Sequence, residues 1–559
     1  YTTTLLGTIS RSTIMNLTLE ENVWHVQWDA SMILPELAGG NRLELTYEIP
    51  ARGNIYDEYG YPLVAQDDAV AIGIVPGKID PENEDGMVSF LANLLDVSED
   101  SIREKYAYAQ ADWYVAIGDV SAAVAQQYSD RFERYPGIVL SPFRSRYYYD
   151  GGIAPHVTGY VLSISPEELE EYQRKGYRGD EKVGAAGLEA WGESYLAGKH
   201  GASLYIKDPQ GQVVTKLASS PAEPANSIYT TIDSTLQYNL QHSMDDYLGA
   251  IVVMERDTGR VLAMVSNPGY NPNLFEPVNY NSIMLQSVLN DPKLPLYNRA
   301  AQGVYPLGSV FKIITMAAAL ETGVFTPDYP YYCGNTWTEL QGVTLYDWTY
   351  TRNLPASGQL TLQEGLMRSC NPWFWHIGYT LWNEGYTTAI ADVAAGFGLG
   401  QKTGIEITEF EGRLEQPTSV SENVQLAIGQ GTLQVSPLQV ASFVAAVGNG
   451  GTLYRPTVVD KIVPVSGGDA VYEFEPDAVS KLPVTEENLA AIQEAMVMVV
   501  RNPRGTATYQ MSSVNVKIAG KTGTAENPIG DSHAWFAGYT FNNDPNKPDI
   551  AVAIILENA

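Results

Sequence analysis

The chain has 559 residues, and its 34 Lys plus Arg against 65 Asp plus Glu give a formal charge of −31. This length exceeds what one hydrophobic core usually serves, so we expect two or three domains. Hydrophobic residues at 45% and charged residues at 18% are typical of a packed globular protein, whereas the acidic balance argues against a nucleic-acid partner.

The sequence predicts no membrane segment, and its cysteines indicate no particular kind of site. The sequence contains no apolar run of about 18 residues and no signal peptide, although the strand-like start at Tyr1 suggests that something precedes it. Two cysteines, Cys333 and Cys370, are too few for a disulfide framework or a four-ligand zinc site. They could form one bridge or remain free; the sequence does not decide, and we favour free thiols.

The first 225 residues contain mostly short elements. Alternating Trp24, Val26 and Trp28 predict a strand within residues 1–50, where two strands with a connection are expected. Residues 51–225 mix short strands with helical segments at 82–95 and 166–175. A stretch rich in Pro, Ala and Ser at 219–225 is the best linker candidate.

From residue 228 the pattern changes. Asp233 or Ser234 is expected to cap a helix that runs to about Tyr247, and strands at 249–255 and 260–266 are expected to form a hairpin. Helical patterns cover 310–322, 362–384, 388–396 and 437–449, and strand patterns return at 515–519, 534–540 and 550–556. Strands at both ends with helices between them predict one α+β domain whose sheet is completed by the C-terminal strands.

The sharpest local motif is Tyr305-Pro-Leu-Gly-Ser-Val-Phe-Lys312, since Ser309 is the only serine with a lysine three positions later. Pro306 and Gly308 place Ser309 at a helix N-terminus, and residues i and i+3 share a helix face. A lysine can activate a serine when burial lowers its pKa. The alternative is a capping serine with a solvated lysine, and the motif alone is weak.

Two further motifs strengthen this interpretation. Ser369-Cys-Asn371 begins an aromatic helical stretch, and Lys521-Thr-Gly-Thr524 follows an apolar strand. Together with SxxK these make the set found in penicillin-binding proteins and β-lactamases. Competing matches exist, and we rank them lower. They are Ser421-Glu-Asn423, Ser513-Val-Asn515 and Lys402-Thr-Gly404, the last of which lacks a flanking strand.

With these motifs the sequence resembles the class B penicillin-binding proteins, which are monofunctional D,D-transpeptidases. Residues 21–50 resemble the tail of the nuclear transport factor 2-like extension of methicillin-resistance-type members. Further similar motifs are Arg52-Gly-Asn-Ile-Tyr-Asp57, Arg146 with Ala154-Pro-His-Val-Thr-Gly-Tyr160, Gly184-Ala-Ala-Gly-Leu-Glu189, Asn298-Arg299, Gly429-Gln-Gly431, Pro437-Leu-Gln439 and Asn449-Gly-Gly451.

The resemblance implies an α+β penicillin-binding transpeptidase fold, with an antiparallel sheet flanked by helices, a helical subdomain and an elongated N-terminal pedestal. The expected domains are a remnant of the extension at 1–50, a pedestal of the dimerisation type at 51–225 and the transpeptidase domain at 226–559. Arg52 and Glu189 are expected to be a structural salt bridge. The family normally adds a C-terminal helix after the last strand, so we expect either a missing tail or a compensating contact there.

The resemblance also implies roles for the motif residues. Ser309 is expected to attack the penultimate D-Ala carbonyl of a peptidoglycan stem peptide, with Lys312 as general base and Ser369 relaying the proton. Asn371 is expected to bind the substrate amide. Lys521, Thr522, Gly523 and Thr524 are expected to bind the substrate, with the N–H groups of Ser309 and Thr524 as the oxyanion hole.

The implied partners are an amine acceptor strand, β-lactam antibiotics and a lipid II polymerase of the shape, elongation, division and sporulation family. No cofactor or metal is expected, and His376 and His533 are interpreted as ordinary side chains. The expected location is the extracytoplasmic face of the bacterial membrane, held by an N-terminal anchor. Alternatives are a D,D-carboxypeptidase or β-lactamase-like hydrolase, and an inactive scaffold or β-lactam sensor.

Overall fold

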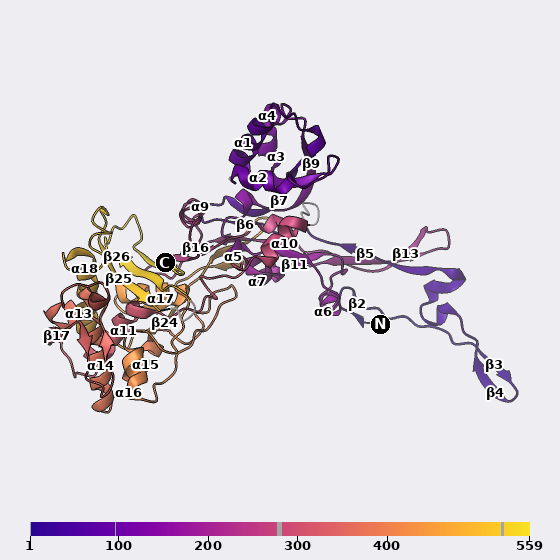
Figure 1. Ribbon diagram of the computed structural model, residues 1–559. Helices are drawn as coiled ribbons and strands as arrows, with labels where there is room; N and C mark the ends of the chain where they lie inside the picture. Colours follow the sequence, from indigo (N-terminus) through magenta and orange to yellow (C-terminus); the bar gives the residue numbers. More distant parts are fainter. Residues whose placement is uncertain (1, 96, 277–281, 527–529) are drawn as a thin grey trace.

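The computed structural model describes residues 2–95, 97–276, 282–526 and 530–559. Figure 1 shows an elongated molecule. The C-terminal half forms a lobe at one end, a smaller lobe with α1 to α4 stands above the middle, and a strand-rich arm extends to the other end. Within the described ranges, every helix is too short or too polar to span a bilayer.

A five-stranded antiparallel sheet forms the centre of the C-terminal lobe, in the order β16–β15–β27–β26–β25. Its strands are β15 (Gly249–Glu255), β16 (Val261–Asn267), β25 (Ile518–Ala525), β26 (His533–Thr540) and β27 (Ile550–Leu556). β15 and β16 form the predicted hairpin, and β27 pairs with β15. One sheet therefore joins the two ends of the domain, which confirms the predicted α+β class.

Helices cover both faces of this sheet because successive strand residues point to opposite sides. α17 (Pro437–Gly448) packs on β15, β26 and β27 from one side. On the other side α9 (Ser234–Ser243) packs on β16 and shares an apolar cluster with Ile251 and Val253. The half-buried Ile554 and Leu556 pack against this cluster as well, so α9 covers part of that face, and the expectation of a missing tail or a compensating contact stays a prediction.

α11 (Lys312–Glu321) lies in the interior of this lobe, and nine of its ten residues are buried. A helix that is apolar all round belongs in the interior of a domain. The other elements of this lobe are α12 (Trp348–Thr351), α13 (Leu362–Arg368), α14 (Asn371–Asn383), α15 (Ala389–Gly396), α16 (Val420–Leu426) and α18 (Glu486–Arg501), with short strands β17 (Tyr331–Cys333), β18 (Thr336–Trp337), β19 (Leu345–Tyr346), β20 (Gly358–Leu360), β21 (Thr452–Tyr454) and β24 (Ala478–Lys481). α10 (Ser282–Asn290) lies outside this lobe, near the middle of the molecule (Figure 1).

A second sheet links this lobe to the N-terminal half, in the order β23–β22–β14–β6–β7–β8 with β9 also paired to β7. The strands are β6 (Ile55–Tyr56), β7 (Pro62–Ile74), β8 (Val115–Ser121), β9 (Ile138–Tyr148), β14 (Asn226–Thr230), β22 (Val459–Pro464) and β23 (Tyr472–Glu473). β14 pairs with β6 on one side and β22 on the other. The sheet thus contains strands from both sides of the expected boundary at 225/226, which stays a prediction.

The small upper lobe packs four helices around β7 and β8 with its own apolar core. These helices are α1 (Glu84–Leu95), α2 (Glu99–Tyr106), α3 (Ala122–Gln127) and α4 (Ser129–Phe132). Below it lie α5 (Pro155–Thr158), α6 (Leu169–Arg174), α7 (Gly187–Trp191), α8 (Glu193–Leu196), β10 (Val161–Ser163) and β11 (Lys182–Gly184).

The arm is a three-stranded sheet followed by a hairpin (Figure 1). β5 (Arg42–Glu48) and β13 (Val213–Ser220) flank β12 (Gly201–Lys207). β3 (Leu17–Glu20) pairs with β4 (Val23–Val26) in the hairpin, and β1 (Thr2–Thr3) pairs with β2 (Gly7–Thr8). Residues 1–50 therefore contain more strands than the two expected.

A buried charge cluster stabilises the junction of β9 and α7. The Glu189 carboxylate is fully buried and accepts hydrogen bonds from Arg52 Nε at 2.8 Å and Arg146 Nε at 2.6 Å. Arg146 also donates to the Gly53 carbonyl at 2.5 Å, and Arg52 pairs with Glu193 at 2.7 Å. The prediction of a salt bridge between Arg52 and Glu189 is confirmed.

Candidate active site

Ser309 lies in a short 3₁₀ turn, Gly308–Phe311, that continues directly into α11. Gly308 has φ of +56° and donates its N–H to the Gly429 carbonyl at 2.9 Å. A Cβ at this position would lie 2.4 Å from the Thr524 carbonyl oxygen. Glycine is therefore required here by both the backbone angle and the close approach of β25.

β25 has a matching glycine on its own side. A Cβ at Gly523 would lie 2.9 Å from Val310 Cγ2 and 3.4 Å from the Leu307 carbonyl oxygen. The half-buried Ser309 thus lies in a turn that contacts β25 closely, because Gly308 and Gly523 have no side chains. β25 has a strand partner on one side only within the described sheet, and the turn packs against it.

Lys312 is fully buried one helical turn after Ser309. Its Nζ donates to Asn371 Oδ1 at 2.6 Å, to the Ser369 carbonyl at 2.8 Å and to Ser369 Oγ at 3.4 Å. These contacts join the SxxK and SxN motifs across 57 or more residues of chain.

Lys521 approaches the same serine from β25. Its buried Nζ lies 2.9 Å from Ser369 Oγ and 2.7 Å from the Thr522 carbonyl. The Ser369 hydroxyl is therefore within reach of two lysine amines, and all three motifs meet at one place.

Burial changes the acidity of both lysines. It lowers the pKa of Lys312 to about 7, while the nearby Asp347 carboxylate opposes this shift. Burial also holds the pKa of Lys521 well below its ordinary value, and the Lys312 amine lowers it further. A neutral amine is thus available near Ser309 at about neutral pH.

The SxN motif lies between two helices. Ser369 follows α13 in a left-handed conformation with φ of +56°, and α14 begins at Asn371. The Asn371 N–H donates to Asp347 Oδ1 at 2.9 Å, and Trp373 N–H donates to Cys370 Sγ at 3.3 Å. Asp347 thereby fixes the start of α14 from a neighbouring segment.

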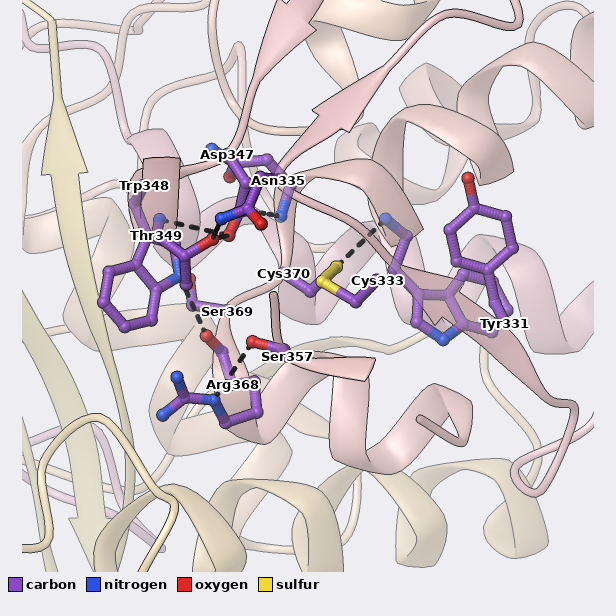
Figure 2. Close-up of a disulfide and its surroundings, with 12 residues drawn as sticks. Tyr331, Cys333, Asn335, Asp347, Trp348, Thr349, Ser357, Arg368, Ser369 and Cys370 are labelled. Carbon is purple, nitrogen blue, oxygen red and sulfur yellow. Dashed lines mark hydrogen bonds between the residues drawn. A yellow bond between two sulfur atoms is a disulfide. The ribbon is translucent and has the colours of Figure 1, made fainter. Parts of the chain in front are cut away.

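Cys333 and Cys370 form a disulfide between β17 and the SxN motif (Figure 2). The sequence-based preference for free thiols is therefore wrong. Thirty-seven residues separate the two cysteines, and their Cα atoms lie 6.3 Å apart in the fold. Spacing along the chain cannot reveal that proximity. Both residues are fully buried.

The potential metal ligands in the described part of the chain do not form a metal site. One close group of three exists, namely Cys333, Asp347 and Cys370. Its sulfurs are joined in the disulfide, so they are not thiolates. His376 instead contacts Glu339 at 2.7 Å, and His533 accepts from the Asn558 N–H at 3.3 Å.

The competing motifs lie elsewhere. Lys402 is exposed, and the N–H groups of Thr403 and Gly404 donate to the Glu409 carboxylate. Asn423 is buried and donates to the Gly378 carbonyl, so it holds α16 against α14. Ser513 and Asn515 lie in the loop before β25, and neither is among the described hydrogen-bond partners of Lys312 and Lys521.

Two residues of the site had no signal in the sequence. Asp347 contacts Asn371 although 24 residues separate them. The Thr506 hydroxyl lies 2.6 Å from the Thr522 hydroxyl, from the loop after α18. Neither belongs to a recognised motif, and only the folded arrangement brings them to the site.

Comparison with known proteins agrees with the geometry. The chain matches the family model described as the penicillin binding protein transpeptidase domain over residues 249–559. It also matches the penicillin-binding protein dimerisation domain over residues 47–230.

Three relatives illustrate the similarity. The chain is 29% identical to the peptidoglycan D,D-transpeptidase MrdA of Haemophilus influenzae, over 93% of this chain and 83% of that protein. It is 29% identical to penicillin-binding protein 3 of Bacillus subtilis, over 96% of this chain and 78% of that protein. A solved structure described as the structural coordination of polymerization and crosslinking by a peptidoglycan synthase complex superposes with a TM-score of 0.66 and 28% identity, covering 94% of this chain and 91% of that one.

Proposed function

Because the chain belongs to the family of penicillin-binding protein transpeptidase domains, we propose that Ser309 carries the acyl group of a peptidoglycan D,D-transpeptidase reaction. The observation that supports this most is that the amines of Lys312 and Lys521 both contact the Ser369 hydroxyl. Lys312 follows Ser309 by three residues, so this group lies beside the proposed nucleophile. Serine needs a neutral base nearby to become a nucleophile.

In the acylation step, Lys312 takes the proton from Ser309 as its Oγ attacks the carbonyl of the penultimate D-Ala. The buried amine, with its pKa of about 7, is partly neutral at physiological pH. Ser369, which contacts both lysines, passes a proton to the leaving D-Ala amine. The N–H groups of Ser309 and Thr524 stabilise the oxyanion, and the close approach of Gly308 to Thr524 supports that pairing.

The substrate peptide binds along the free edge of β25. An extended chain can add to such an edge as a further strand. Asn371 binds the substrate amide, and Lys521, Thr522, Gly523 and Thr524 line the place of the terminal carboxylate. That carboxylate favours the protonated form of Lys521, which burial otherwise disfavours.

An amine from a second peptidoglycan strand then completes the reaction. Its nitrogen attacks the acyl carbonyl, the new C–N bond replaces the ester bond to Ser309 Oγ, and the amine proton returns to the serine oxygen. A β-lactam acylates Ser309 in the same first step and remains attached.

The wider setting follows from the relatives. The description of the matched solved structure names both polymerization and crosslinking. This supports a lipid II polymerase of the shape, elongation, division and sporulation family as the partner. The substrate supports a location on the extracytoplasmic face of the bacterial membrane, held by an N-terminal anchor. The likeness of residues 21–50 to the tail of a nuclear transport factor 2-like extension of the methicillin-resistance type stays a prediction.

A covalent label tests this function. The full chain is incubated with a fluorescent penicillin, and the adduct is measured by intact mass and by gel fluorescence. We expect one adduct on the wild type, none on Ser309→Ala, and an unchanged adduct on Ser421→Ala, which alters a competing motif on α16. An adduct that survives Ser309→Ala would overturn the assignment of the nucleophile. The rate at which water releases the adduct separates a transpeptidase from a β-lactamase-like hydrolase.

A further inference from the structure

Three arginines gather beside the motifs, and among the residues that the structure describes none of them pairs with a carboxylate. We call Arg352, Arg368 and Arg504 the arginine cluster. Arg368 immediately precedes Ser369, and Arg504 lies two residues before Thr506, whose hydroxyl contacts Thr522. The cluster therefore borders both the SxN motif and the Lys521 strand.

Backbone carbonyls and one indole ring hold the cluster together. Arg368 donates to the Arg504 carbonyl at 2.8 Å, and Arg504 donates to the Ser357 carbonyl at 2.7 Å. The guanidinium groups of Arg368 and Arg352 lie 5.0 Å and 5.6 Å from the centre of the Trp348 ring. Figure 2 shows Arg368 beside Trp348, Ser357 and Ser369. These contacts orient the guanidinium groups but leave their charge unneutralised.

The missing partner is unexpected in this chain, which has 65 acidic residues and 34 basic ones. Two other exposed arginines of the same lobe pair with acids, Arg413 with Glu415 and Arg455 with Asp477, whereas the exposed Arg501 donates to the Val516 carbonyl. In the described ranges no carboxylate lies within 4.0 Å of the three guanidinium groups.

Asp347 is the acid that influences the pKa of Arg368, but its carboxylate already accepts hydrogen bonds from other residues. Burial and the charge of Arg504 lower the pKa of Arg368, and Asp347 opposes this effect. Asp347 itself is fully buried and accepts hydrogen bonds from Asn371 and Thr349. Arg352 and Arg504 are exposed to solvent, so a ligand can reach them.

The position of the cluster suggests what it binds. It lies on the Lys521 and Thr522 side of the site, where the proposed function places the terminal carboxylate and the leaving amine. The acceptor amine enters by the reverse of the step in which that amine leaves, and therefore through the same position. The leaving D-Ala carries its carboxylate on the carbon next to the amine, and an acceptor of the same type presents its carboxylate to the same side.

We propose that the arginine cluster is a subsite for the carboxylate of the acceptor, namely the one on the carbon that bears the attacking amine. This inference rests on the proposed function. It predicts that the enzyme selects α-amino acid or diaminodicarboxylic acid acceptors over amines that lack the adjacent carboxylate. The transfer itself is unchanged: the C–N bond forms, the ester bond to Ser309 breaks, and one proton moves from the amine to the serine oxygen.

Two small acceptors test it on the full chain. A thioester donor ending in D-alanine, with a thioglycolate leaving group, acylates the enzyme, and D-alanine or D-alaninamide is added as acceptor. The ratio of transfer to the two acceptors is measured by chromatography. Their amines differ in basicity, but that difference is the same for every protein variant, so the change in ratio reports the protein alone.

We expect Arg504→Gln and Arg352→Gln each to lower the preference for D-alanine by about two- to fivefold, which is typical of one solvent-exposed charge pair. Arg504→Lys should retain most of it because the charge stays. Arg413→Gln, which removes an exposed arginine away from the motifs, should leave the ratio unchanged. Added salt should reduce the preference of the wild type more than that of Arg504→Gln.

Three other outcomes overturn the inference. An unchanged ratio in both glutamine variants shows that the cluster does not sense the acceptor. A variant that slows acylation only when the donor leaving group carries a carboxylate, while the acceptor ratio stays constant, shows that the cluster serves the donor instead. An absence of acyl-enzyme on the wild type overturns the proposed function, and this inference with it, and the acylation measurement separates that case from the first two.

Discussion

At the scale of single residues, the site contains two buried lysines, and no acid of the described residues forms an ion pair with either of them. Lys312 donates only to neutral oxygens of Ser369 and Asn371. Burial disfavours the charged amine, so the fold keeps a neutral base near Ser309. An acidic chain with formal charge −31 thus contains a site in which burial disfavours the positive charge of both lysines.

This arrangement predicts the pH dependence of acylation. The reacting form of Lys312 is the neutral amine, so the rate of penicillin acylation should rise with pH through about 7 and then level off. Asp347 raises the pKa of Lys312, so Asp347→Asn should move this rise to lower pH while its amide can still cap α12. Stopped-flow acylation rates between pH 5.5 and 9 measure both curves. A rise at the same pH in the two proteins would contradict the proposed influence of Asp347.

At the scale of elements, the segment between the two cysteines positions the SxN motif in addition to its contacts with the lysines. Residues 333–370 form a loop closed by the disulfide, and the same loop contributes Asp347, which accepts from the Asn371 N–H. Cys370 also caps α14 through its sulfur. Ser369 and Asn371 are therefore held at the positions in which they contact Lys312.

Cys333→Ala tests this role of the disulfide. Removing a bridge that closes a loop of this size typically lowers the free energy of unfolding by about 2–4 kcal/mol. We also expect slower acylation at temperatures at which the variant is fully folded, because Ser369 and Asn371 lose one restraint. Denaturant unfolding and acylation rates measure the two effects.

The matched variant is Cys333→Ala with Cys370→Ser, since serine can still cap α14. If the bridge acts as one unit, the double variant should be no less stable than Cys333→Ala alone. Val253→Ala on the opposite face of the sheet should reduce stability without affecting the acylation rate of folded protein. Equal slowing in Val253→Ala would mean that lost stability, not lost positioning, explains the effect.

Local patterns in the sequence predicted the local parts of this site. The i, i+3 spacing placed Ser309 and Lys312 within one helical turn. The strand predicted at 515–519 overlaps β25 only at 518–519, because the Lys521 motif lies inside that strand and not after it. Contacts between distant segments could not be predicted in the same way. Lys521 meets Ser369 across 152 residues, and the two cysteines meet only because β17 packs beside α14. The resemblance, not the residue pattern, supplied the expectation that the three motifs converge.

At the scale of the whole molecule, one sheet crosses from the N-terminal half into the transpeptidase lobe. β14 lies between β6 and β22, and the Gly53 N–H donates to the Leu196 carbonyl at 2.8 Å. A Cβ at Gly53 would lie 1.9 Å from the Asn226 carbonyl oxygen. The two halves are thus joined by continuous strand pairing and close backbone contact, and the expected boundary at 225/226 falls within this joint.

The buried charges at Glu189 belong to the same joint. Glu189→Gln removes the carboxylate shared by Arg52 and Arg146, which are 10% and 2% exposed at their side chains. Loss of one partner from a buried ion pair typically costs about 3–5 kcal/mol, because the remaining charges stay buried and uncompensated. We expect a clear loss of stability in urea unfolding, together with unchanged penicillin acylation of the protein that remains folded.

The exposed pair of Glu170 and Arg174 on α6 is the control, since Glu170→Gln should change stability by less than about 1 kcal/mol. Acylation that falls in Glu189→Gln under folded conditions would instead show that this cluster communicates with the site through the shared sheet.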